Sequence, residues 1–167
     1  MDITEIMEMR KKSYEEFEKY KTIDNLDIII PTSIQNGYNR LGKEIISNEV
    51  CESLLDVRSI HYHNVVNKKI IDYTFPEWIV CLEEELLLEY AIPIFSRTLL
   101  HYPMLSGMNN EWEVLYLISR ISREFWQENE EWKNYYKSII EKVINENRID
   151  FLSIAQEYLS CFEKFIK

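Results

Sequence analysis

The sequence predicts a mainly α-helical protein, a compact bundle of five or six helices that forms a single domain over residues 1–167. Hydrophobic residues make up 46% of the chain and recur at helical spacing in several long segments. Only three glycines and four prolines are present, too few for the many turns of an all-β sandwich or barrel. A length of 167 residues is typical of one domain.

The first third of the chain contains two expected helices joined by an extended segment. Residues 2–21 place Ile3, Ile6 and Phe17 on one helical face. The β-branched run that ends at Pro31 is expected to be a short strand or an extended connector. A second helix is then expected from residue 33 or 38 to residue 57, because its apolar residues recur at helical spacing: Ile45, Ile46, Val50, Leu54 and Val57.

The next stretch, residues 58–75, is rich in β-branched and aromatic side chains. Two β-prone runs, residues 59–66 and 69–75, flank the pair Asn67-Lys68, which suits a tight turn. We therefore expect a small β-hairpin near residues 59–75 in preference to continued helix.

The second half of the chain is expected to be helical throughout, apart from loops. Pro76 suits the first turn of a helix, and Pro93 should kink or end that helix. A short helix is expected over residues 94–102, and residues 106–110 form a loop. Three amphipathic helices follow, beginning near Trp112, Trp132 and Asp150.

The last of these helices is apolar around most of its circumference. Leu159 and Phe162 belong to one stripe, and Tyr158, Cys161 and Phe165 belong to a second stripe beside it. A helix with so narrow a polar face must be covered on two sides. We favour a central helix of the bundle, and a homodimer through this helix is the alternative.

Composition also indicates the surroundings of the protein. The chain has a net charge of −10 and a pI of about 4.9, which disfavours nucleic acid and attracts cationic surfaces. It shows no secretory signal and no apolar stretch near the roughly 20 residues that span a bilayer. Three cysteines without a CxxC pair suggest reduced thiols. We expect a cytoplasmic protein with no membrane association, from a bacterium or a phage.

One short motif suggests catalysis. Arg58 and His63 form an R-x4-H pair, which resembles the active motif of the HEPN (higher eukaryote and prokaryote nucleotide-binding) ribonucleases. The resemblance covers six residues, and Ser59 matches in part the polar residue that often follows the arginine in that family. It implies metal-independent RNA cleavage, with His63 as general acid or base and Arg58 stabilising the phosphorane.

No other motif indicates a cofactor or a metal. His61 and His63 would share one face of a strand, but no HExxH or CxxC supplies further ligands. Phosphate-binding and dinucleotide-binding glycine motifs are missing as well. We therefore expect no cofactor and no metal.

The favoured function is that of a non-catalytic acidic binding protein that docks on a basic, toxin- or nuclease-like partner and neutralises it. Immunity proteins, antitoxins and inhibitors of defence nucleases work in this way. Trp126 is expected to remain partly exposed. The alternatives are the HEPN-like ribonuclease and a helical homo-oligomeric scaffold without a catalytic role. The candidate contacts with the partner are Glu83, Glu84, Trp126, Glu128, Glu130, Glu131 and Trp132.

Overall fold

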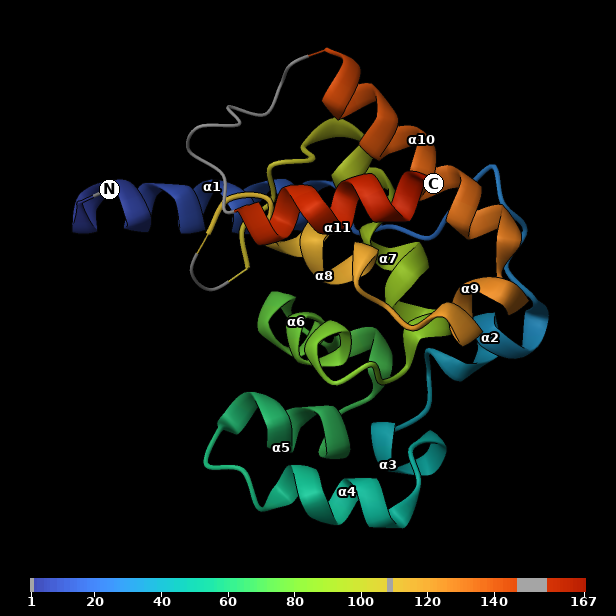
Figure 1. Cartoon of the computed structure of the whole chain (residues 1–167). Helices are drawn as coiled ribbons and strands as arrows, with labels where there is room; N and C mark the ends of the chain where they lie inside the picture. The colour runs from blue at the N-terminus through green and yellow to red at the C-terminus, as the bar shows by residue number, and fades with distance from the viewer. Residues whose placement is uncertain (1, 108–109, 147–155) are drawn as a thin grey trace. The chain divides into compact units, whose positions relative to one another are not determined.

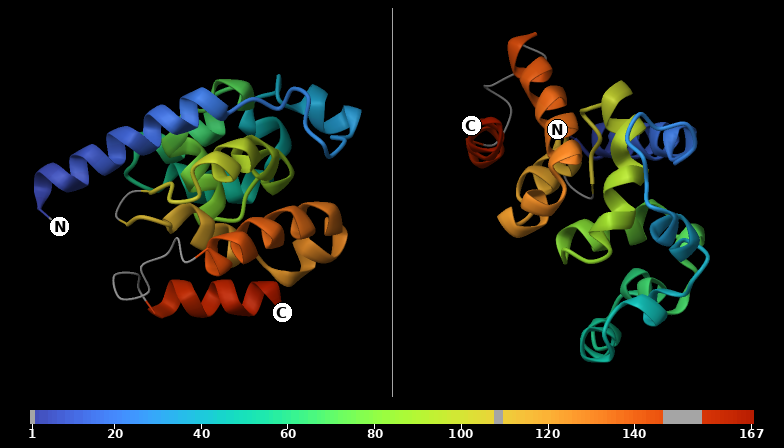
Figure 2. Two further views of the ribbon diagram at one scale, coloured as in Figure 1. Left: turned by 90° about the horizontal axis from the view of Figure 1, so that it is seen from above. Right: turned by 90° about the vertical axis from the view of Figure 1, so that its right-hand side faces the viewer.

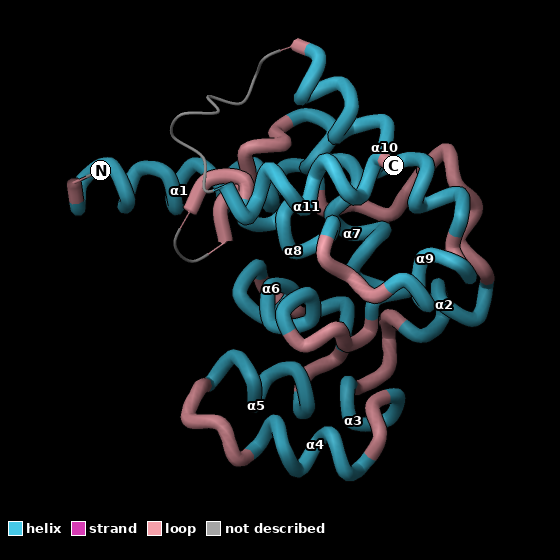
Figure 3. The backbone as a smooth tube through the Cα atoms, in the orientation of Figure 1, coloured by secondary structure: helices cyan, strands magenta, loops and turns pink. Residues whose placement is uncertain are grey.

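The computed structural model describes residues 2–107, 110–146 and 156–167 (Figure 1). Within these ranges the chain forms eleven α-helices and one 3₁₀ turn, and it contains no named strand (Figure 3). The predicted mainly α class is confirmed. The helices are more numerous than the five or six expected, because turns divide the longer predicted segments. No helix in these ranges is long and apolar enough to cross a membrane.

The chain divides into two compact units, which we describe separately. Unit 1 contains residues 1–28 and 94–167, and unit 2 contains residues 29–93. Helix α7 (Leu88–His101) passes from unit 2 to unit 1 directly after Pro93, which lies inside the helix. The single domain over residues 1–167 stays a prediction.

Unit 2 is a set of short helices around a central one. It contains α2 (Thr32–Gly37), α3 (Gly42–Ile45), α4 (Asn48–Leu55), α5 (Ile60–Asn67), the 3₁₀ turn η1 (Ile70–Asp72) and α6 (Phe75–Glu83). Helix α5 packs against α3, α4 and α6, and its residues Val65 and Val66 are buried. Two of the three free cysteines, Cys51 and Cys81, are also buried in this unit.

The predicted β-hairpin near residues 59–75 is wrong, because this stretch forms α5 and η1. Three of its β-branched residues, Val65, Val66 and Ile70, are buried in the core, and β-propensity largely reflects such packing. The extended residues after α5 pair with a distant segment. The Gly42 N–H donates to the Lys68 carbonyl (3.0 Å), and the Ile70 N–H donates to the Arg40 carbonyl (2.9 Å).

Gly42 is required where these two segments meet. A Cβ at this position would overlap with the backbone carbonyl of Val65 and with the Tyr73 hydroxyl. That hydroxyl donates a hydrogen bond to the same carbonyl. The close backbone approach therefore depends on the absence of a side chain.

Unit 1 is built on α1 (Ile3–Tyr20), the later part of α7, α8 (Glu113–Ser119), α9 (Arg123–Glu128), α10 (Glu130–Asn145) and α11 (Gln156–Ile166). Helix α11 packs against α8 and α10, and the views of Figures 1 and 2 agree on this. The buried hydroxyls of Ser13 and Ser106 lie 2.8 Å apart, and the Ser106 N–H donates to the Ser13 Oγ at 3.0 Å. This contact attaches α1 to the loop before α8.

Both apolar stripes of the C-terminal helix supply buried residues. Phe162 from the first stripe is fully buried, and Tyr158 and Phe165 from the second are each 8% exposed. The predicted start of this helix at Asp150 lies outside the described residues. The homodimer through this helix stays a prediction.

Candidate functional site

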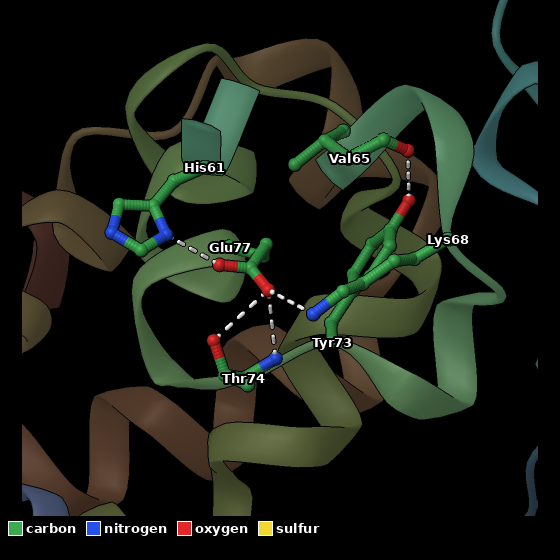
Figure 4. A network of polar contacts seen from close by, with 6 residues as sticks. All are labelled: His61, Val65, Lys68, Tyr73, Thr74 and Glu77. Carbon is green, nitrogen blue, oxygen red and sulfur yellow. Dashed lines mark hydrogen bonds and ion pairs between the residues drawn. The ribbon is translucent and has the colours of Figure 1, made fainter. Parts of the chain in front are cut away.

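A buried carboxylate organises the main polar network of unit 2. Glu77 is fully buried in α6, and it accepts hydrogen bonds from His61 and Lys68 (Figure 4). The His61 Nδ1 lies 2.7 Å from one carboxylate oxygen, and the Lys68 Nζ lies 3.3 Å from the other. Thr74 adds its hydroxyl at 2.9 Å and its backbone N–H at 3.3 Å. Four donors thus replace the water that burial removes.

The start of α6 explains how the chain positions this carboxylate. Thr74 is the N-cap residue, and Glu77, three residues later, forms a capping box with it. Pro76 lies in the first turn, where no backbone N–H is needed. The sequence Thr74-Phe75-Pro76-Glu77 carries the S/T-x-x-E signature, so sequence reasoning could have found this residue but did not.

The electrostatics of the network keep Glu77 ionised at neutral pH. Burial by itself raises the pKa of Glu77, but hydrogen bonds from His61, Thr74 and Lys68 outweigh it and bring the pKa below the ordinary value. An ionised carboxylate only accepts, so the His61 Nδ1 must carry the proton it shares. Its partners, His61 and Lys68, keep 40% and 38% of their side chains exposed.

This geometry holds the His61 imidazole in one orientation. Its second ring nitrogen points away from Glu77 (Figure 4). A carboxylate that fixes the Nδ1–H of a histidine leaves Nε2 free to accept or donate a proton, as in many catalytic sites. In the described residues, no nucleophile is hydrogen-bonded to His61. The contacts of the network therefore orient the His61 imidazole and join α5 to α6.

The residues of the predicted ribonuclease pair lie at the start of α5. Arg58 is exposed just before the helix, and His63 lies within it. The His63 Nε2 lies 3.0 Å from the Leu55 carbonyl oxygen, which can only accept, so Nε2 donates. Catalysis by Arg58 and His63 stays a prediction.

The shared metal face considered for His61 and His63 depended on a strand, and the chain is helical there. Residues two apart on a helix are separated by about 200° around its axis. In the described parts of the chain, no group of three or more His, Cys, Asp or Glu side chains could hold a metal ion.

The predicted acidic contacts fall into two sets. Glu83 and Glu84 are exposed at the end of α6 in unit 2, where Glu84 accepts a hydrogen bond from the Tyr62 hydroxyl at 2.9 Å. Glu128, Glu130 and Glu131 are exposed where α9 meets α10 in unit 1. The candidate contacts therefore belong to two different units, with one set in each.

The predicted exposure of Trp126 is wrong, because this side chain is only 4% exposed. Its ring meets Phe125 and Phe165 edge to face, with centroids 5.0 and 5.4 Å away. Trp132 is 9% exposed and packs on Tyr135 and Tyr136. Trp126 is buried because its ring packs between α9 and α11, where it contacts Phe165.

No protein-family model matches the chain, and comparison with curated proteins and with solved structures finds no match. The functional proposals below therefore rest on the chemistry of the described side chains.

Proposed function

We propose that this protein is a non-catalytic binding protein that docks on a basic, toxin- or nuclease-like protein and neutralises it. The observation that carries the proposal is an acidic patch along α9 and the start of α10, which consists of Glu124, Glu128, Glu130 and Glu131. All four side chains are exposed, and none forms an ion pair with a described residue.

Carboxylates without an internal cation are available to an external one. Glu130 and Glu131 lie in the first turn of α10, where the helix dipole favours negative charge and the backbone holds them in place. Two neighbouring carboxylates suit the guanidinium groups of a basic partner, which form charge-assisted hydrogen bonds. The net charge of −10 extends the attraction beyond contact distance.

The burial of Trp126 affects how the complex would be held. A tight complex needs a desolvated centre in addition to long-range attraction. Trp126 does not supply it in the packing described above, so we assign the recognition of the partner to the acidic patch. Glu83 and Glu84 remain candidates for a second contact from unit 2.

The test compares two charge reversals that change the net charge equally. The double variant Glu130→Lys, Glu131→Lys alters the acidic patch, and Glu8→Lys, Glu15→Lys alters two exposed carboxylates of α1. The tagged protein is used to capture a partner from host lysate at low salt, and the purified partner is assayed with and without the chain. Electrostatic steering changes association rates by roughly 10- to 1,000-fold, so the patch variant should associate at least about tenfold more slowly.

The expected partner is a basic protein whose activity the wild-type chain suppresses at equal concentration. Added salt should slow its association much more than it speeds its dissociation. A captured partner that is acidic, or equal effects of the two double variants, would contradict the proposal.

A further inference from the structure

A groove in unit 1 has a charge opposite to that of the chain as a whole. Its volume is about 620 Å³, and it is lined by residues at the end of α8, in α9, near the start of α10 and near the end of α11. Among the described residues it is lined by five cationic side chains and by no carboxylate side chain. The cations are Arg120, Arg123, Lys133, Lys164 and Lys167.

This composition differs from that of the whole chain. The sequence has 29 acidic and 19 basic residues, so a random lining would contain more acidic than basic side chains. None of the five cations forms an ion pair with another described residue. The Arg120 guanidinium lies over the Tyr116 ring, 5.5 Å from its centroid, which favours one position of this long side chain. Cations that line one groove repel one another, and an anion bound among them would relieve this repulsion.

The floor of the groove is apolar. Ile121, Trp126 and Phe165 line it, and each is less than a tenth exposed. An apolar floor beneath cations lowers the local dielectric and strengthens their attraction for an anion. It also offers a surface for a planar ring.

Trp126 provides a second and independent indication of a ligand. Its indole N–H is buried and has no hydrogen-bond acceptor among the described residues. Most buried donors have a partner, and an indole nitrogen can only donate. Trp126 also lines the groove, so a ligand bound there could supply the missing acceptor once the atoms that cover the N–H move aside.

We propose that this groove binds a small phosphorylated molecule with a planar ring, of nucleotide size. Five cations match the several negative charges of a phosphate chain, and the apolar floor matches the ring. The volume lies in the range of roughly 300–1,000 Å³ that is usual for small-molecule sites. A long nucleic acid is disfavoured, because phosphates beyond the groove would meet the field of a chain with net charge −10. No residue of the acidic patch lines the groove, and the inference does not depend on the function proposed for that patch.

Isothermal titration calorimetry with ATP, UTP, inorganic triphosphate, adenosine and a short single-stranded RNA tests the proposal. The groove variant is Arg123→Glu, Lys164→Glu. The matched control is Lys137→Glu, Lys142→Glu, which reverses two cations of α10 that do not line the groove. Circular dichroism and thermal unfolding establish that both variants fold, and Lys133→Glu alone serves as a milder groove variant.

We expect saturable binding of at least one of the two nucleotides, and weaker binding of triphosphate and of adenosine. Each lost charge-assisted hydrogen bond should weaken binding by about tenfold, so the groove variant should lose at least that much and the control should not. Trp126→Phe keeps an aromatic ring but removes the N–H donor. It should therefore also weaken binding.

Three results would overturn the proposal. The first is no saturable binding of either nucleotide or of triphosphate at millimolar concentration. The second is triphosphate binding as tightly as the nucleotides, which would identify a site for bare anions. The third is a single-stranded RNA that binds more tightly than either nucleotide and loses this binding in the groove variant.

Discussion

Glu77 illustrates how one buried side chain can connect several elements. It completes the N-terminal cap of α6. Its contacts with His61 and Lys68 join α6 to α5 and to the residue that directly follows α5. A buried charge is tolerated only with such a full set of partners. Replacing Glu77 should therefore affect stability and its dependence on pH.

We predict that Glu77→Gln destabilises the protein at neutral pH by about 3 kcal/mol, because it breaks a buried ion pair. The pKa of Glu77 is lowered on folding, so its charge stabilises the native state above the ordinary value of 4.5. This stabilisation is lost as the pH falls below 4.5 towards the native pKa. Urea unfolding at pH 7 and at several values below 4.5 should show a smaller loss of stability on acidification in the variant.

Glu44 provides the control for this prediction. It also accepts a hydrogen bond at the start of a helix, from the Leu41 backbone N–H, and this bond is the main cause of its lowered pKa, but it is exposed to solvent. Glu44→Gln should change the pH dependence much less. Equal acid sensitivity of wild type and Glu77→Gln would show that the Glu77 network does not stabilise the fold.

At the scale of elements, the end of α6 shows why the helices are shorter than predicted. The expected helix after Pro76 ends at Glu83, well before Pro93. The Leu86 N–H donates to the Cys81 carbonyl (2.8 Å) and the Glu85 N–H to the Leu82 carbonyl (3.3 Å), which is the pattern of a Schellman motif. Glu85 adopts a φ of 51° at the position where glycine is preferred.

We predict that Glu85→Gly stabilises the protein by about 1 kcal/mol, because glycine adopts the left-handed conformation without a steric penalty. Thermal or urea unfolding of the wild type and the variant measures this difference. Glu85→Ala is the matched variant, since it removes the same carboxylate and keeps a Cβ; it should not stabilise. A gain of similar size in both variants would instead implicate the charge.

At the scale of the molecule, α11 bears on the oligomeric state. Phe165 is 8% exposed, and its ring meets Trp126 edge to face at 5.4 Å. This packing favours a structural role for Phe165 within unit 1. The sequence alone also allowed Phe165 to lie at a dimer interface.

We predict that Phe165→Glu unfolds unit 1, because an unpaired buried carboxylate costs several kcal/mol. Size-exclusion chromatography with light scattering and thermal unfolding test this. Ser160→Glu, at an exposed position of the same helix, should leave both measurements unchanged. A folded monomer of Phe165→Glu obtained from a dimeric wild type would support the interface instead.

The sequence by itself determined the mainly α class, since apolar spacing and the scarcity of glycine and proline are local signals. It also indicated the acidic run at residues 128–131. The exposure of these carboxylates could be predicted from the local sequence, without knowledge of distant contacts. The hairpin prediction was wrong because β-propensity could not distinguish packing in a helical core from packing in a sheet.

Only the tertiary structure decided which side chains meet. Glu77 and His61 are 16 residues apart, and Ser13 and Ser106 are 93 apart. The cations of the groove come from four helices and their ends, and nothing in their spacing showed that they converge. Trp126 is buried for the same reason, since the exposed fraction of a side chain depends on which distant elements pack over it.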